Sequence, residues 1–181
     1  SYVLVAERAM GQIKLSVFVH RRHAHAISAV ETSYTPTGVL GIGKNKGGVA
    51  LALHFRNQRL CVVNADLAAH QEKKLQRNQD VRNILRSTRL GSTTCELTAQ
   101  YHTIWMGDLN YRIDLNAAGA SPPYTDASAH HQAVLKRIED GAWEELLLAD
   151  QLNMCKASGE AFHGFREGEI TFKPTFKVLR G

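Results

Sequence analysis

The chain has 181 residues, of which 44% are hydrophobic, 22% charged and 7% aromatic. These values are typical of a globular protein and exclude disordered, collagen-like and disulfide-scaffold classes. The length predicts a single domain over residues 1–181. The net charge of +5 is uneven, because residues 1–90 hold 14 Lys and Arg against 5 acids (+9) and residues 91–181 hold 8 against 12 (−4). The basic half predicts an anionic partner.

The cysteines and apolar runs bear on the compartment. Three cysteines, at positions 61, 95 and 155, are too few and too widely spaced for a disulfide framework or a zinc ribbon. The longest apolar runs are too short to cross a bilayer, and no signal-peptide pattern opens the chain. These features predict a reducing, cytoplasmic setting.

Strands dominate the first third of the chain. Apolar side chains alternate with polar or small ones from Ile13 to Val19, the period-two pattern of a half-buried strand. Weaker strand patterns cover 2–5 and 26–30. The later elements expected are a glycine-rich loop over 36–48, strands over 49–55 and 60–64, a helix over 68–89, a buried strand over 101–106, a loop over 113–126, helices over 127–140 and 142–153, and a strand over 169–176.

The helix over 68–89 is expected to bury a stripe that consists of Leu75, Val81, Ile84 and Leu85. Strand pairs mixed with helices predict a layered α/β or α+β domain.

The glycine-rich loop resembles a P-loop over residues 38–44, but Asn45 occupies the position where Ser or Thr would hold magnesium. A strand rather than a helix follows, so no helix N-terminus is available for phosphate. The same difference counts against a dinucleotide-binding loop. Two interpretations stay open: a surface loop, or a loop in which Lys44, Asn45 and Lys46 contact an anion.

The segment 105–112 joins an apolar strand directly to Asp108, Asn110 and Arg112. On an extended backbone Asp108 and Asn110 point the same way, and a carboxylate at a buried strand end is costly unless it meets a cation, a metal ion or donors. One interpretation is a catalytic carboxylate with a carboxamide that orients a water or a phosphate oxygen, and with Arg112 as a clamp or ion-pair partner. The other is an Asx-turn with a surface salt bridge.

The strand over 60–64 is also followed by polar side chains, namely Asn64, Asp66 and His70. If this strand and the strand over 101–106 are neighbours, their polar ends form one pocket at a sheet edge. Taken alone, His70 is more typical of a surface or cap residue, and Arg77 of a solvated helix surface.

Four motifs, in order along the chain, resemble one known family. They are N-K-G-G at 45–48, V-N-A-D-L-A-A-H with R-N-Q-D between 63 and 80, W-M-G-D-L-N-Y-R at 105–112, and E-G-E-I-T-F-K-P-T-F-K at 167–177. They are similar to segments of the inositol polyphosphate 5-phosphatases, within the endonuclease/exonuclease/phosphatase superfamily. The subgroup that contains the Lowe-syndrome phosphatase is the most similar. The resemblance covers nearly the whole chain.

The resemblance implies a two-sheet β-sandwich flanked by helices, in a four-layer αββα arrangement, of which this chain would be the central part and incomplete at both ends. It implies Mg²⁺-dependent removal of the 5-phosphate from phosphoinositides or soluble inositol polyphosphates, by attack of an activated water on phosphorus. The expected partners are these ligands and the cytosolic face of a membrane, to which the protein would bind peripherally, and not nucleic acid. It implies no oligomeric state.

The resemblance also assigns residue roles. Asp108 would activate or orient the water, Asn110 would hold the water or a phosphate oxygen, and Arg112 would support the turn. Substrate binding is assigned to Asn45, Lys46, His70, Arg77, Asn78, Phe176 and Lys177. The family's metal-binding Glu and its late Asp-His pair have no counterpart in these residues, so the metal ligands are not identified and this stretch alone is expected to be inactive.

Three residues depart from the family pattern. Asp66 occupies the catalytic position of a family His that contacts the scissile phosphate. Asp is anionic and cannot donate a proton at neutral pH, so it repels a phosphomonoester unless a metal lies between them. Phe176 replaces a Tyr and loses its hydroxyl, and Lys44 replaces a Gly and adds positive charge.

Two alternatives to a 5-phosphatase stay open. The departure at Asp66 favours a non-catalytic phosphoinositide-binding relative. The basic half would also suit another phosphoesterase of the superfamily, such as a nuclease or a sphingomyelinase. Against a nuclease, no run of aromatic residues is interleaved with the basic ones as a stacking surface for bases would need.

Overall fold

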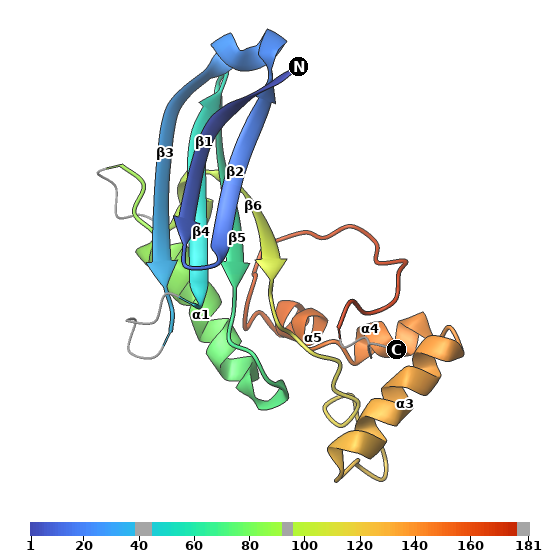
Figure 1. The fold of residues 1–181 in the computed structure, drawn as a ribbon. Coiled ribbons are helices and arrows are strands. Elements are labelled where there is room, and N and C mark those ends of the chain that lie inside the picture. The colour runs from blue at the N-terminus through green and yellow to red at the C-terminus, as the bar shows by residue number, and fades with distance from the viewer. Residues whose placement is uncertain (39–44, 92–95, 177–181) are drawn as a thin grey trace. The chain divides into compact units, whose positions relative to one another are not determined.

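The computed structural model describes residues 1–38, 45–91 and 96–176. The chain divides into two compact units, Ser1–Asn110 and Tyr111–Gly181. We call them the first and the second unit and describe each by itself (Figure 1). The assignment of residues 1–181 to a single domain stays a prediction.

The first unit contains two β-sheets. One consists of the antiparallel strands β1 (Tyr2–Met10) and β2 (Ile13–His20). The other has four strands in the order β3-β4-β5-β6, which are β3 (Ile27–Pro36), β4 (Gly47–Phe55), β5 (Gln58–Asp66) and β6 (His102–Asp108). β3, β4 and β5 pair antiparallel, whereas β5 and β6 pair parallel. The two weakly patterned segments at 2–5 and 26–30 thus lie in or overlap full strands.

The two sheets pack face to face around an apolar core. Alternate residues of β4, namely Val49, Leu51 and Leu53, pack against Met10, Ile13 and Leu15 of the β1–β2 sheet. Side chains two apart on a strand point to the same face, and Ile13 and Leu15 of this cluster belong to the period-two pattern that predicted the strand over 13–19 correctly.

The other face of β4 carries small residues and lies against α1 (Lys74–Ser87). A Cβ atom on Gly48 would lie 2.9 Å from Cγ2 of Ile84, which is closer than real Cβ contacts. Glycine at this position therefore lets the helix approach the sheet closely. Gly47 and Gly48 were predicted to be loop residues, but they begin β4.

The helix expected over 68–89 is shorter than predicted and buries a different set of residues. A 3₁₀ turn, η3 (Gln71–Lys73), precedes α1. Val81, Ile84 and Leu85 are buried as expected, but Leu75 is 72% exposed. Leu75 lies outside the buried stripe. In the first turns of α1 the polar residues Arg77, Asn78 and Asp80 take the inward positions.

The strand expected over 101–106 is present as β6, preceded by the single helical turn α2 (Leu97–Gln100). Its predicted burial is wrong, because Ile104 and Met106 are 56% and 45% exposed. β6 is the last strand in the sheet order, so a neighbouring strand covers it on one side.

Cys61, on the adjacent β5, is fully buried as expected of a core residue, and burial raises the pKa of its thiol to about 12.

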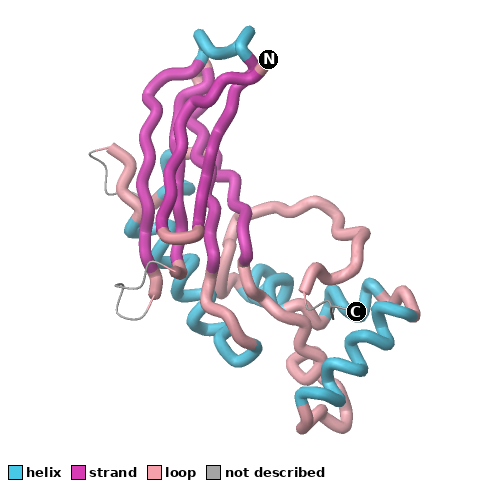
Figure 2. The backbone as a smooth tube through the Cα atoms, in the orientation of Figure 1, coloured by secondary structure: helices cyan, strands magenta, loops and turns pink. Residues whose placement is uncertain are grey.

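The second unit contains helices joined by irregular segments (Figure 2). The helices are α3 (Ala127–Glu139), α4 (Trp143–Leu148) and α5 (Gln151–Ser158). The single helix expected over 142–153 is wrong, because Asp150 caps α5 by accepting a hydrogen bond from the Leu152 backbone N–H at 2.9 Å and so starts a new helix. The strand expected over 169–176 is also wrong, since residues 169–176 form bends and irregular chain.

The predicted fold class is confirmed as mixed α/β, with two sheets and flanking helices. Among residues 1–38, 45–91 and 96–176, no helix has the length and apolar character needed to cross a membrane.

Candidate active site

The ends of β5 and β6 lie side by side because the two strands run parallel. Their register pairs Asp66 with Asp108, and the Leu67 backbone N–H donates to the Asp108 carbonyl oxygen at 3.0 Å. On the other side of β5, Asp66 pairs with Gly47 at the start of β4. Three polar segments, at 45–47, 66–70 and 108–110, therefore meet at one edge of the sheet.

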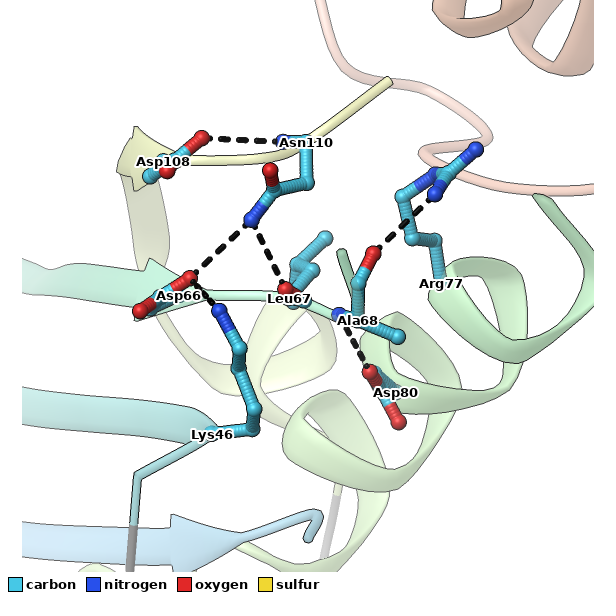
Figure 3. A network of polar contacts seen from close by, with 8 residues as sticks. All are labelled: Lys46, Asp66, Leu67, Ala68, Arg77, Asp80, Asp108 and Asn110. Carbon is cyan, nitrogen blue, oxygen red and sulfur yellow. Dashed lines mark hydrogen bonds and ion pairs between the residues drawn. The ribbon is translucent and has the colours of Figure 1, made fainter. Parts of the chain in front are cut away.

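Asp66 is at the centre of the contacts at this edge (Figure 3). Its Oδ1 atom accepts a hydrogen bond from Lys46 Nζ at 2.6 Å and another from Asn110 Nδ2 at 3.1 Å. Asn110 Nδ2 also donates to the Leu67 carbonyl oxygen at 2.9 Å. The structure thus brings together three of the residues singled out in the sequence.

Asn110 was predicted to lie on an extended backbone together with Asp108. In the structure it contacts Asp66 from a turn instead. β6 ends at Asp108, and Asn110 has a φ of 58°, a conformation that Asn adopts more readily than most residues. The Asn110 backbone N–H donates to Asp108 Oδ1 at 3.2 Å, which is the hydrogen bond of an Asx-turn. The Asp108 side chain itself is exposed at the surface of this edge.

Gly107 allows the two strand ends to pair this closely. Its φ is 128°, and a Cβ atom there would lie 2.0 Å from the Ala65 carbonyl oxygen. No role was predicted for Gly107, although its position directly before Asp108 could have indicated that the backbone needs a glycine there.

Side chains of α1 bind the backbone of the loop that follows β5. Arg77 is fully buried, and its Nη1 atom donates to the carbonyl oxygens of Ala68 and His70 at 3.0 and 2.6 Å. The Ala68 backbone N–H donates to Asp80 Oδ2 at 3.0 Å. The buried guanidinium of Arg77 is therefore bonded to backbone carbonyl oxygens, which indicates a structural role. Its role in substrate binding stays a prediction.

Asp80 carries a buried carboxyl group close to the site, and no role was predicted for it. Burial raises its pKa, and hydrogen bonds from Gln76 and from the Ala68 backbone N–H, together with the charge of Lys46, lower it in part. Asp80 is only 1% exposed, and it contacts the loop after β5 through the Ala68 backbone N–H.

Replacing Arg77 with Lys is expected to destabilise the fold by about 2 kcal/mol, because one ammonium group cannot reproduce the fork of donors that contacts the loop carbonyls. Thermal or urea unfolding measures the loss. Arg82→Lys, on the same helix, is the matched control and is expected to change stability by less than about 0.5 kcal/mol. An equal effect of the two variants would contradict the structural role.

The other predicted residues of the first unit differ in their exposure and contacts. Asn45 and His70 have exposed side chains, and His70 contributes its carbonyl oxygen to the contact with Arg77. Asn78 is 1% exposed, so it has no surface to offer a substrate. Asn64 donates to the Lys14 carbonyl oxygen at 2.7 Å and so bonds to β2 rather than to the other residues at the strand ends.

Two predicted residues lie together in the second unit. The Arg112 guanidinium stacks over the ring of Phe176, 4.2 Å from its centroid, and the Phe176 side chain is 61% exposed. The Arg112 backbone N–H donates to Gln151 Oε1 at 3.2 Å. Lys177 and Lys44 lie outside the described residues.

The described residues do not by themselves make up a magnesium site. Mg²⁺ prefers oxygen ligands such as carboxylates, and Asp66 and Asp108 supply them at the strand ends. However, Asp66 is ion-paired with Lys46, and within residues 1–38, 45–91 and 96–176 no three His, Cys, Asp or Glu side chains are grouped so that they could hold a metal ion.

Comparison with known proteins shows the family to which this two-sheet sandwich, with carboxylates and amides at adjacent strand ends, belongs. The chain belongs to the endonuclease/exonuclease/phosphatase family 2, whose family model matches residues 1–181. The family match covers the whole chain and agrees with the resemblance to inositol polyphosphate 5-phosphatases.

Individual relatives point to the same group. The chain is 39% identical to the mouse type II inositol 1,4,5-trisphosphate 5-phosphatase over 93% of its own length and 16% of that protein. It is 35% identical to the zebrafish (Danio rerio) phosphatidylinositol 3,4,5-trisphosphate 5-phosphatase 2B over 99% of its length and 14% of that protein. The chain therefore spans about a sixth or less of these relatives.

A solved structure is similar over the same range. The inositol polyphosphate 5-phosphatase domain of a synaptojanin, in complex with inositol (1,4)-bisphosphate and calcium, matches with a TM-score of 0.84 and 29% identity. The match covers 99% of this chain and 48% of that one. These findings confirm the resemblance that the four motifs predicted.

Proposed function

We propose that this chain is part of a magnesium-dependent phosphomonoester hydrolase that removes the 5-phosphate from phosphoinositides or inositol polyphosphates. The observation that carries the proposal is the parallel register of β5 and β6, which sets Asp66, Asp108 and Asn110 at one edge beside Lys46. The similarity to 5-phosphatases supports the choice of substrate. A cytoplasmic location and peripheral binding to a membrane surface belong to the same proposal.

The reaction that we propose is attack of a water on phosphorus, which breaks the bond between phosphorus and the 5-oxygen of the inositol. The inositol oxygen leaves with a proton taken from solvent, and inorganic phosphate is released. The exposed Asp108 carboxylate accepts a proton from the water and orients it, and the Asn110 backbone N–H fixes that carboxylate through the Asx-turn. The Asn110 carboxamide nitrogen donates to Asp66 and to the Leu67 carbonyl oxygen, so these contacts fix the Asn110 side chain beside Asp108. Lys46 supplies positive charge toward the phosphate. Magnesium, if bound by the complete protein, would stabilise the negative charge of the phosphoryl group.

The direct test is phosphate release by the complete protein. It is expected to release phosphate from an inositol ligand with phosphates at positions 4 and 5 in the presence of Mg²⁺, and to lose this activity with a chelator. Product analysis shows whether the 5-phosphate is the one removed. Release of no phosphate by the intact protein would overturn the proposal.

A second candidate function is non-catalytic binding of phosphoinositides. Asp66 favours it, because an ionised Asp at the position of the family His cannot donate a proton to the reaction, and its carboxylate is ion-paired with Lys46. In the same assay this function gives ligand binding that weakens with salt, without release of phosphate.

A further inference from the structure

Asp66 occupies the position in the candidate site that a ligand anion would need. Its Oδ1 atom accepts from the ammonium of Lys46 at 2.6 Å and from the carboxamide of Asn110 at 3.1 Å. A cation and an amide donor converging on one oxygen are also the groups that bind a phosphate oxygen. In this structure both donors point to an oxygen of the protein itself (Figure 3).

The charges of Lys46 and Asp66 are only partly exposed to solvent. The Lys46 and Asp66 side chains are 25% and 32% exposed, so their attraction is screened less than that of fully exposed charges. A phosphate monoester carries about −1.5 to −2 charges at neutral pH. Bound near Lys46, it would have to lie close to the Asp66 carboxylate or displace it from the ammonium group.

Asp66 has little freedom to move away. It is the last residue of β5 and pairs with Gly47 on one side and Asp108 on the other. The backbone under the carboxylate is therefore fixed by both neighbouring strands. A ligand can break the contact with Lys46, but the negative charge stays at the edge of the sheet.

We propose that Asp66 is an internal anion that competes with the ligand phosphate for Lys46 and so sets the affinity of the site. The inference rests on the proposed function. It makes Asp66 a specificity-determining residue: it neutralises Lys46 in the absence of ligand and disfavours phosphorylated ligands.

The test compares binding of inositol 1,4,5-trisphosphate by the complete protein and its variants, measured by calorimetry with a chelator present to prevent turnover. Asp66→Asn keeps the shape and an oxygen that accepts from Asn110, but it removes the charge. This variant is expected to bind about tenfold more tightly, which corresponds to about 1.4 kcal/mol.

Glu7→Gln is the matched control. Glu7 is also paired with a lysine, since its carboxylate lies 3.8 Å from Lys14 Nζ, and it accepts a hydrogen bond from Ser16. It lies on β1, in the other sheet. The two substitutions change the net charge equally, so an effect of Asp66→Asn that Glu7→Gln does not share is local to the site.

A double-mutant cycle with Lys46→Met tests the mechanism. If Asp66 acts through Lys46, the gain from Asp66→Asn falls from about tenfold to below about threefold when Lys46 is absent. Asp66→Ser removes the same charge with a smaller side chain and is expected to give the same gain, so the test does not depend on one variant folding well.

The outcomes separate the two proposals. If the wild-type protein binds the ligand and neither Asp66 variant binds it more tightly, the inference about Asp66 is wrong and the proposed function stands. A gain that persists unchanged with Lys46→Met also overturns competition for Lys46. If no form of the protein binds the ligand, both proposals are overturned.

Discussion

Asp108→Ala is expected to lower kcat/KM of the complete protein for a 5-phosphorylated inositol ligand about a thousandfold, equivalent to about 4 kcal/mol of transition-state stabilisation. The carboxylate is exposed at the end of β6 and is held by the Asn110 backbone N–H at 3.2 Å. In the proposed mechanism, the attacking water would then lose both its proton acceptor and the group that orients it. Steady-state phosphate release measures the effect.

Asp108→Asn separates the charge from the turn. The carboxamide keeps an oxygen that can accept from the Asn110 backbone N–H, so the turn is retained, but it is a poor proton acceptor. We expect nearly the same loss of activity as for Asp108→Ala, with an unchanged melting temperature. Activity within tenfold of wild type in Asp108→Asn would show that Asp108 acts on the geometry of the turn and not on the water.

Gly107→Ala is expected to destabilise the first unit by about 4 kcal/mol or more, through overpacking combined with backbone strain. The added Cβ would lie 2.0 Å from the Ala65 carbonyl oxygen, and both atoms belong to paired strands that cannot separate without breaking their hydrogen bonds. The φ of 128° adds strain for any residue other than Gly. Chemical denaturation, with Trp105 of the same strand as the fluorescent probe, measures the loss.

Gly119→Ala is the control that separates crowding from backbone strain. Gly119 also has a positive φ, 92°, but nothing lies within 4 Å of an added Cβ. Its substitution therefore reports the strain alone, which is expected to cost about 1 kcal/mol. Equal losses for the two variants would mean that the close approach of β5 and β6 is not what requires Gly107.

Local pattern predicted the positions of β2, β4, β5 and β6, because a strand that is buried on at least one face needs apolar side chains at regular positions. Val49, Leu51 and Leu53 face the other sheet while Gly48 faces Ile84 of α1, but which face of β6 is exposed was not predicted. The polar ends of β5 and β6 were expected to form one pocket only on the condition that the two strands are neighbours, and the structure shows that they are. The parallel pairing that aligns Asp66 with Asp108 depends on sheet topology, which no local pattern encodes.

The errors arose where tertiary contacts outweigh local pattern. Arg77 looked like a surface residue, but three backbone carbonyls compensate for its burial. Residues 169–176 alternate in the manner of a strand, yet a strand needs a partner, and this segment pairs with none among the described residues. The contact of Asp66 with Lys46 was not predicted either, because the two residues lie 20 positions apart and meet only through the pairing of β4 with β5.

The parallel pairing of β5 with β6 also bears on how the protein folds. β3, β4 and β5 are antiparallel neighbours in sequence order, so they can pair early, whereas β6 joins only after residues 67–101 have crossed over through α1. Asp108 and Asn110 arrive with that last strand. The site is therefore complete only when the slowest-forming contact of the sheet is made, and a ligand that binds across both strand ends would stabilise the docking of β6 in preference to the rest of the sheet.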